Sequence, residues 1–259
     1  MKTDFVTAGG ARLEYAWYRP AAADTTTLIV LHEGLGCVAM WRDFPEKLAA
    51  ETGCGVLVYS RQGYGRSDPC DLPRPVSFMH NEGLKVLPEL IAALGIRDHV
   101  LLGHSDGGSI ALIYAGGVET DELKGVVTLA AHVFVEDISV TSIDAIKTVF
   151  ETTDLSAKLA RYHGDNTECA FWGWNGVWLN PEFRDWNIVN FMPAVAVPVL
   201  AIQGVDDEYG TADQVQAIAE KTGSGAQTLM LEACGHSPHR DQPEATAAAI
   251  AGFVRELTR

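Results

Sequence analysis

The sequence predicts an α/β fold: a mostly parallel eight-stranded sheet with helices on both faces and a helical segment inserted late in the chain. Three observations predict it. Apolar runs of strand length alternate with segments of helical spacing through most of the 259 residues. A serine between two glycines joins one such run to a helix at residues 103–107. The alternation then stops between residues 132 and 195 and resumes afterwards.

The expected strands begin with a hairpin. Residues 4–18 alternate apolar and polar side chains around Gly9 and Gly10, which predicts two antiparallel strands at one edge of the sheet. Six apolar runs follow, at 27–31, 56–60, 100–102, 125–131, 198–203 and 227–231. Runs that are apolar throughout are typical of strands buried on both faces, and the helices between them indicate parallel pairing.

Helical segments separate these runs. The expected helices cover residues 41–52, 81–94, a segment that starts after Ser105, 212–221 and 244–257. In the helix over 81–94, aliphatic residues at helical spacing predict an apolar face, formed by Leu84, Leu87, Leu90, Ile91 and Leu94. Gly95 follows this face directly and is expected to end the helix.

The inserted segment differs from the rest of the chain. Residues 132–195 contain helical patches at 142–152 and 155–163, then a tryptophan-rich stretch, and no run of strand quality. An insertion of this length between two strands of a sheet is typical of a lid over a site. We therefore expect residues 1–131 and 196–259 to form the α/β core and residues 132–195 to form a helical lid.

The composition limits the partners. A net charge of -15 disfavours binding to nucleic acid or to an anionic membrane, because both would repel the chain. The five cysteines lack the spacing of metal ligands, which favours reduced thiols and no metal. No apolar export signal follows the first residues, and no apolar run approaches the ~20 residues that span a bilayer. We expect a cytoplasmic protein that binds a small molecule, with a homodimer as an open alternative.

Ser105 stands at the turn between an apolar strand and a helix. A serine at such a turn adopts a strained backbone conformation, so the residues two positions before and two after it must lack side chains. Gly103 and Gly107 meet this requirement. The turn exposes the hydroxyl at the carboxyl edge of the sheet, beside the N–H groups at the start of the helix. The pattern therefore predicts a nucleophilic serine.

Two of the later strands are followed by the groups that a serine nucleophile needs. One is followed by Asp206 and Asp207, and the last is followed by His236. Because parallel strands bring their carboxyl ends to one edge, these side chains are expected to meet Ser105. A serine hydroxyl is a weak nucleophile until an imidazole takes its proton, and a carboxylate must orient that imidazole.

With these motifs, the chain resembles the α/β-hydrolase superfamily over nearly its whole length. The resemblance implies that Ser105 is the nucleophile and His236 the general base. It implies Asp207 as the acid that orients the histidine, because the family's aspartate usually lies three residues after a glycine that Gly204 matches. Asp206 is the alternative acid.

A loop at residues 32–36 resembles the oxyanion loop of that superfamily. The resemblance implies an oxyanion hole formed by the backbone N–H groups of Gly34 and Asp106. The chain departs from the family pattern at two positions. Glu33 replaces a usual glycine, which leaves open whether Gly34 or Leu35 supplies the N–H. Asp106 replaces a neutral residue, and we expect its carboxylate to lie in the first helical turn, where the helix dipole favours it.

The function favoured by the sequence is a serine hydrolase of small to medium carboxylic esters or lactones that works through an acyl-enzyme, without cofactor or metal. Leu35, Trp172 and Trp178 are candidates for its apolar substrate pocket, with packing inside the lid as the alternative for the tryptophans. A carbon–carbon bond hydrolase of aromatic degradation and a thioesterase are alternatives that use the same triad. A non-catalytic ligand receptor on this fold is an alternative of another class, and turnover would discriminate it.

Overall fold

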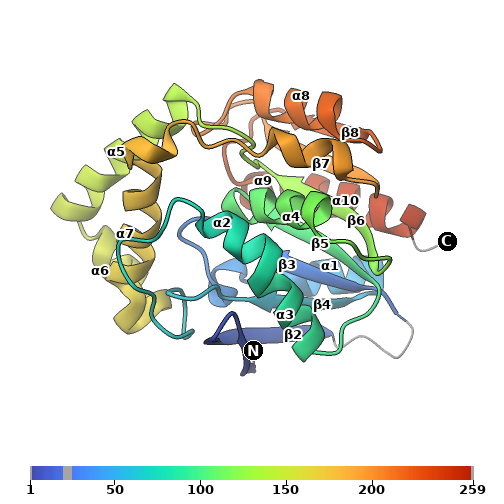
Figure 1. Ribbon diagram of the computed structural model, residues 1–259, viewed down its shortest axis with the longest axis horizontal. Helices are drawn as coiled ribbons and strands as arrows, with labels where there is room; N and C mark the ends of the chain where they lie inside the picture. The colour runs from blue at the N-terminus through green and yellow to red at the C-terminus, as the bar shows by residue number, and fades with distance from the viewer. Residues whose placement is uncertain (1, 20–24, 258–259) are drawn as a thin grey trace.

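The computed structural model describes residues 2–19 and 25–257 (Figure 1). Among these residues, eight strands form one sheet in the order β1-β2-β4-β3-β5-β6-β7-β8. The pairs β1–β2 and β2–β4 at one edge are antiparallel, and the later pairs are parallel. The predicted mostly parallel eight-stranded α/β fold is confirmed.

The strands coincide closely with the apolar runs of the sequence. Their bounds are β1 (Thr3–Ala8), β2 (Ala11–Arg19), β3 (Thr27–Leu31), β4 (Gly55–Tyr59), β5 (His99–His104), β6 (Leu123–Leu129), β7 (Val199–Gly204) and β8 (Ala226–Leu231). Every residue of β3 and β5, which pair in the middle of the sheet, is buried. The carboxyl ends of these two strands are therefore held by packing on both faces.

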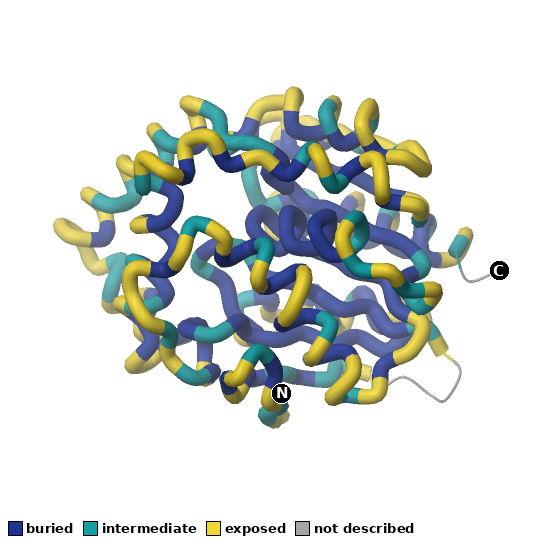
Figure 2. Tube along the Cα trace, in the orientation of Figure 1, coloured by how far each residue is buried: buried dark blue, intermediate teal, exposed yellow. Residues whose placement is uncertain are grey.

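Helices cover both faces of the sheet. The core helices are α1 (Phe44–Thr52), α2 (Phe78–Asn81), α3 (Leu87–Ala93), α4 (Asp106–Gly117), α8 (Ala212–Lys221), α9 (Pro238–Asp241) and α10 (Pro243–Leu257). Successive strand residues point to opposite faces. Leu28 and Val30 therefore pack toward α1 and α10, whereas Ile29 and Leu31 pack toward α3, α4 and α8. Figure 2 shows the inner strands and α4 as the most deeply buried part of the molecule.

The segment between β6 and β7 is helical. It contains α5 (Asp137–Thr152), α6 (Leu155–His163), η3 (Gly164–Asn166), α7 (Thr167–Trp178), η4 (Pro181–Phe183) and η5 (Val189–Ala194). Helices α5, α6 and α7 lie together beyond one end of the sheet (Figure 1). Within residues 2–19 and 25–257, no helix is both long and apolar enough to cross a bilayer.

The helix predicted at 81–94 begins earlier and is not regular. It consists of α2, a π turn η2 (Glu82–Val86) and α3. The wide turn changes the helical register, so Gly83 faces Ile113 and Val86 is buried, whereas Leu84 is 41% exposed. The assignment of Leu84 to the apolar face was therefore wrong. The other predicted positions, from Leu87 onward, lie C-terminal to the π turn and keep their inward orientation.

This change of register has a measurable consequence. We expect Leu87→Ala to lower the free energy of unfolding by about 2–5 kcal/mol, because it opens a cavity in the core. Leu84→Ala is expected to lower it by no more than about 1 kcal/mol, because a large part of the side chain is already exposed to water. Urea denaturation of the two variants beside the parent measures both. Equal losses would indicate a regular helix through residues 82–86.

Candidate active site

The turn between β5 and α4 carries Ser105 in a strained conformation. Its φ is 52° and its ψ is -120°, in a region that side-chain-bearing residues rarely adopt. A Cβ atom on Gly103 would collide with the backbone of Gly107, and one on Gly107 would collide with the carbonyl of Leu31. The two glycines are thus required by close backbone packing, as predicted for such an elbow. Ser105 N also donates to Leu129 O at 2.9 Å, which fixes the turn to β6.

The structure brings Ser105, His236 and Asp207 into one hydrogen-bonded chain. His236 Nε2 lies 3.0 Å from Ser105 Oγ, and His236 Nδ1 lies 2.8 Å from Asp207 Oδ1. The carboxylate can only accept, so Nδ1 carries the proton and Nε2 is free to accept from the serine hydroxyl. The three side chains come from loops at the carboxyl ends of β5, β7 and β8.

Of the two adjacent aspartates, Asp207 contacts the histidine. Its Oδ1 also accepts the backbone N–H of Tyr209 at 2.8 Å, whereas the side chain of Asp206 is exposed. Burial alone would raise the pKa of Asp207. The hydrogen bond and the charge of His236, with the Tyr209 N–H, outweigh burial and lower this pKa below its ordinary value. Asp207 is therefore ionised at neutral pH and suited to orient the imidazole.

Side chains outside the Ser105–His236–Asp207 hydrogen bonds hold the backbone of His236 in place. His104 Nε2 donates to His236 O at 2.7 Å, and His236 N donates to Glu208 Oε2 at 3.2 Å. The ring of Tyr209 lies 4.7 Å, centroid to centroid, from the imidazole. These contacts limit the motion of the imidazole and keep it near Ser105.

The loop at residues 32–36 presents a backbone N–H in a fixed direction. Glu33 O accepts three hydrogen bonds, from His32 Nδ1 at 2.7 Å, Arg61 Nη2 at 3.0 Å and Gly36 N at 3.1 Å. The peptide group that joins Glu33 to Gly34 is planar and trans, so the Gly34 N–H points away from these three donors. Gly34 lines the cavity in front of Ser105. The Gly34 N–H therefore has a fixed direction, and Leu35, which lines the same cavity, stays the alternative oxyanion donor.

The backbone N–H groups of Gly34 and Asp106 are free to bind a substrate. Neither of them donates to any group among the described residues. Asp106 is the first residue of α4, where helical N–H groups have no acceptor within the helix. These two backbone donors without an acceptor, one in the loop at 32–36 and one on the residue after Ser105, are groups of the kind that an oxyanion hole uses.

The side chain of Glu33 is turned toward the histidine loop. Its Oε2 lies 3.5 Å from His104 Nδ1, and its Oε1 lies 3.4 Å from Arg240 Nη2. Burial alone would raise the pKa of Glu33, but His104 and Arg240 outweigh it and hold this pKa well below the usual value. The glutamate that replaces a family glycine thus connects the loop at 32–36 to the loop that carries His236.

Asp106 makes a contact that the sequence does not indicate. Its Oδ1 accepts from the indole Nε1 of Trp178 at 3.1 Å, and its Oδ2 has no hydrogen-bond partner among the described residues. Burial raises the pKa of this carboxyl, against the opposing charge of Arg61. The side chain lies in the first helical turn, as expected, but it anchors α7 instead of facing water.

A cavity of about 320 Å³ opens in front of Ser105. Its apolar wall is formed by residues of the 32–41 region and of the inserted segment, namely Leu35, Met40, Ile143, Leu155, Leu159, Trp174 and Trp178. Of the predicted substrate-binding residues, Leu35 and Trp178 line this cavity. Trp172 does not line it: its indole donates to Glu168 at 2.7 Å and packs on Phe150. Residues four apart share a helix face, so Trp174 accompanies Trp178.

His132 lines the cavity and was missed by the sequence analysis. Its ring lies 5.0 Å from Trp178 and 5.5 Å from His236, centroid to centroid. Burial, with the nearby His236, lowers its pKa to about 3, so it is neutral at physiological pH. Its Nδ1 has no partner among the described residues. His132 follows the end of β6, at the edge of the sheet where the other loops of the site meet. This position in the sequence could have identified it as a site residue.

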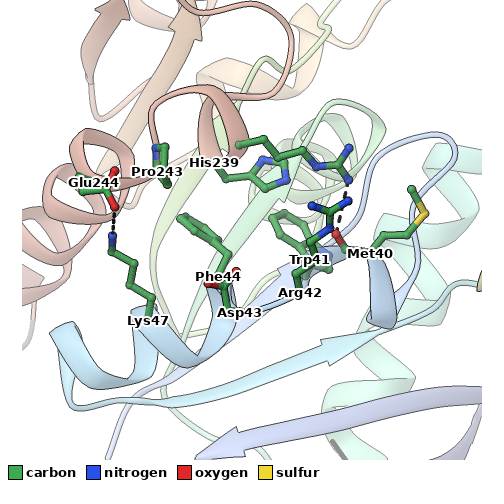
Figure 3. Close-up of a pocket in the computed structure, with 10 residues that line it drawn as sticks. Met40, Trp41, Arg42, Asp43, Phe44, Lys47, His239, Pro243 and Glu244 are labelled. Carbon is green, nitrogen blue, oxygen red and sulfur yellow. Dashed lines mark hydrogen bonds and ion pairs between the residues drawn. The ribbon is translucent and has the colours of Figure 1, made fainter.

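A second cavity of about 250 Å³ lies between α1 and α9 (Figure 3). Trp41 and Phe44 pack against His239 in its wall, with 4.7 Å between the ring centroids of Trp41 and His239. Ser105 does not line this cavity. In the described part of the chain, no group of three or more His, Cys, Asp or Glu side chains is arranged to hold a metal.

Comparison with known proteins bears on the family and the fold. The sequence profile of the Alpha/beta hydrolase family matches residues 28–249. A proline iminopeptidase of Lactobacillus delbrueckii subsp. lactis is 26% identical over 183 residues, which are 69% of this chain and 59% of that protein. The chain thus spans little more than half the length of this curated relative.

Solved structures share the fold. The proline iminopeptidase of Mycobacterium smegmatis superposes with a TM-score of 0.74 at 22% identity and covers 99% of both chains. The enol-lactonase of Burkholderia xenovorans LB400 superposes with a TM-score of 0.75 at 16% identity, over 97% of this chain and 100% of that chain.

The role of Arg61 in orienting the loop at 32–36 can be tested by Arg61→Lys. Lysine cannot donate to two carbonyls in the same fork geometry, so the Gly34 N–H loses its fixed direction. We expect kcat for p-nitrophenyl butyrate to fall about 10- to 100-fold with little change in KM, because an oxyanion donor acts mainly in the transition state. Arg66→Lys, at an exposed position of the same loop, is the control. Equal kinetics of the two variants would contradict this role.

Proposed function

The chain belongs to the alpha/beta hydrolase family, and from this premise we propose that it is a serine hydrolase that cleaves small to medium carboxylic esters or lactones through an acyl-enzyme. The observation that carries the proposal is the hydrogen-bonded chain from Asp207 through His236 to Ser105, with distances of 2.8 and 3.0 Å. It ends at a cavity whose volume falls within the usual range for small-molecule sites.

In the first half of the reaction, Ser105 Oγ attacks the ester carbonyl carbon while His236 Nε2 takes the hydroxyl proton. Asp207 keeps the proton of the neutral imidazole on Nδ1 and stabilises the imidazolium that forms. The backbone N–H groups of Gly34 and Asp106 bind the tetrahedral oxyanion. His236 then returns the proton to the leaving alcohol oxygen, and the acyl group stays on Ser105.

In the second half, water takes the place of the alcohol. His236 removes a proton from this water as it attacks the acyl carbon, and the same two N–H groups bind the second oxyanion. Collapse of this intermediate frees the carboxylic acid and returns the proton to Ser105. A single imidazole thus serves as base and acid in both halves.

The cavity supports an apolar acyl group of modest size. In the proposal, residues 132–195 act as a lid, whose α7 presents Trp174 and Trp178 to the acyl chain. The aliphatic side chains of Leu155 and Leu159 on α6 extend this surface. His132 lines the cavity and is neutral at physiological pH, so its ring can contact the substrate without adding a charge.

A proline iminopeptidase activity is the second candidate, since relatives carry that name. The observation that favours it is the exposed carboxylate of Glu208 on the cavity wall, which would attract a cationic amino group. A thioesterase, a carbon–carbon bond hydrolase and a non-catalytic receptor remain alternatives. A panel of p-nitrophenyl esters, lactones, thioesters and prolyl p-nitroanilide, run with the parent and with Ser105→Ala, decides among them.

Removal of the nucleophile is the direct test. Ser105→Ala is expected to lower kcat for p-nitrophenyl butyrate by at least about 10³-fold, because no acyl-enzyme can form. A fluorophosphonate probe is expected to label the parent at Ser105 and to leave the variant unlabelled. Circular dichroism checks that the variant is folded. Activity that survives in a folded variant would refute the proposed nucleophile.

The identity of the acid is tested by a matched pair of variants. Asp207→Asn is expected to lower kcat by about 10³- to 10⁴-fold, because the amide stabilises the wrong tautomer of His236. Asp206→Asn is expected to change kcat by less than about threefold, since its side chain points into solvent. The two substitutions remove the same charge one residue apart. A larger loss in Asp206→Asn would reverse the assignment.

A further inference from the structure

Two cysteine side chains from distant parts of the sequence face each other at the side of α7. Cys70 lies in the loop between β4 and α2, and Cys169 lies in the first turn of α7. Their Sγ atoms are 2.6 Å apart, and both residues are partly exposed. The other cysteines, Cys37, Cys54 and Cys234, are buried and unpaired with one another. The facing pair is thus the one that a reagent in solution can reach.

A buried guanidinium lies beside the two sulfurs. A Cβ atom on Gly63 would lie 2.5 Å from Arg74 Nη2 and 2.8 Å from each of the two sulfurs, so these three atoms converge at one point. Gly63 also has a φ of +84°, which a larger residue adopts only with strain. Arg74 is only 7% exposed and lies 4.9 Å above the ring of Tyr64. Its charge is therefore held in place next to the thiols.

This environment favours one thiolate. The hydrogen bond between the two sulfurs, the N–H of Cys70 at 3.3 Å and the charge of Arg74 lower the pKa of Cys169, against the effect of burial. The carbonyl oxygen of Cys70 also lies 3.3 Å from Cys169 Sγ and opposes this shift. The pKa of Cys70 is raised, because its thiol proton is bound to Cys169 and because it is partly buried. Thiolate character and access are the two requirements of a reactive cysteine.

The pair joins a wall of the cavity to the core. Helix α7 carries Trp174 and Trp178, which line the cavity in front of Ser105. Asn166, just before α7, already binds the same core loop through a 2.7 Å hydrogen bond to the carbonyl of Ser67. A covalent bond between the sulfurs would fix the start of α7 to this loop.

We propose that Cys70 and Cys169 form a thiol–disulfide exchange site, at which a low-molecular-weight disulfide of the glutathione class reversibly cross-links α7 to the loop after β4. The cross-link itself is independent of the catalytic proposal. Its effect on substrates rests on the proposed function, because it restrains a wall of that cavity.

The exchange occurs in two steps. The Cys169 thiolate attacks one sulfur of the small disulfide, which forms a mixed disulfide and releases one small thiolate. Cys70 then loses its proton to solvent and its sulfur attacks Cys169 Sγ, which forms the protein disulfide and releases the second small thiolate. Two protein thiols are oxidised, and one small disulfide is reduced to two thiols. An excess of the reduced small thiol reverses both steps.

Peptide mapping tests the site directly, because trypsin places each cysteine on a separate peptide. Cys70 lies on 67–85, where the Arg74–Pro75 bond resists cleavage, and Cys169 lies on 162–184. The full chain is incubated with oxidised glutathione, alkylated and digested without reductant. We expect these two peptides to be recovered joined, and to separate after dithiothreitol. Recovery of both peptides alkylated, or joined to other cysteine peptides, would overturn the proposal.

Single variants test the order of the steps. Cys70→Ser keeps the thiolate and is expected to retain one glutathione on 162–184. Cys169→Ser is expected to remain unmodified at Cys70 under the same conditions. Cys54→Ser, which removes a buried thiol elsewhere, is the matched control and is expected to cross-link like the parent. Preferential modification of Cys70 in Cys169→Ser would contradict the mechanism.

Thermal unfolding and kinetics test the consequence. The cross-link closes a loop of about 100 residues and is expected to raise the Tm by about 5–10 °C in the parent but not in Cys70→Ser. It is also expected to lower the kcat/KM ratio of p-nitrophenyl octanoate to acetate by about threefold or more, because α7 can no longer yield to a long acyl chain. An unchanged ratio in the cross-linked enzyme would overturn this effect. Fluorophosphonate labelling of Ser105 in both redox states reports separately on the proposed function.

Discussion

The close packing of three backbone segments beneath Ser105 is the constraint on which the site depends. Gly103 lies against Gly107, and Gly107 lies against the carbonyl of Leu31, so β3, β5 and the start of α4 approach as closely as backbones allow. The strained turn is stable because buried neighbours on both faces of the sheet pack against it and leave it no other conformation. The hydroxyl of Ser105 and the free N–H of Asp106 are thereby fixed relative to the sheet, and the loops after β7 and β8 bring the acid and the base to them.

A buried cation organises the second half of the site. Arg61 is fully buried, and in the described part of the chain it makes no salt bridge. Its two terminal nitrogens donate instead to the carbonyls of His32 and Glu33, and its Nε has no hydrogen-bond partner among the described residues. Carbonyl oxygens that face a cation leave the N–H groups of the same peptides facing the other way. The positive charge of Arg61 also lies close behind the loop at 32–36 and makes the electrostatic potential there more positive.

The sequence predicted the features that follow from short-range patterns, namely the strands, the elbow around Ser105 and the loops that carry Asp207 and His236. It could not predict those that depend on tertiary context. The exposure of Leu84 results from a π turn, and the spacing of the apolar residues does not predict that turn. To predict that Trp174 and not Trp172 lines the cavity, one would have to know where α7 starts. In a stretch with several tryptophans, the helical spacing of the apolar residues cannot be read from the sequence. The bond between Asp106 and Trp178 joins segments that no local pattern relates.

The two tryptophans that line the cavity offer a fluorescence signal for binding at the site. The Trp174 indole lies directly against Gly34, and the Trp178 indole binds Asp106, so each ring sits beside one of the peptide groups assigned to the oxyanion. Both residues line the cavity although they are nearly buried, so an acyl group there would contact the ring atoms that face it. We therefore expect occupancy of the cavity to change the intrinsic fluorescence of the protein, so that a bound intermediate could be followed without a chromogenic leaving group or an attached dye.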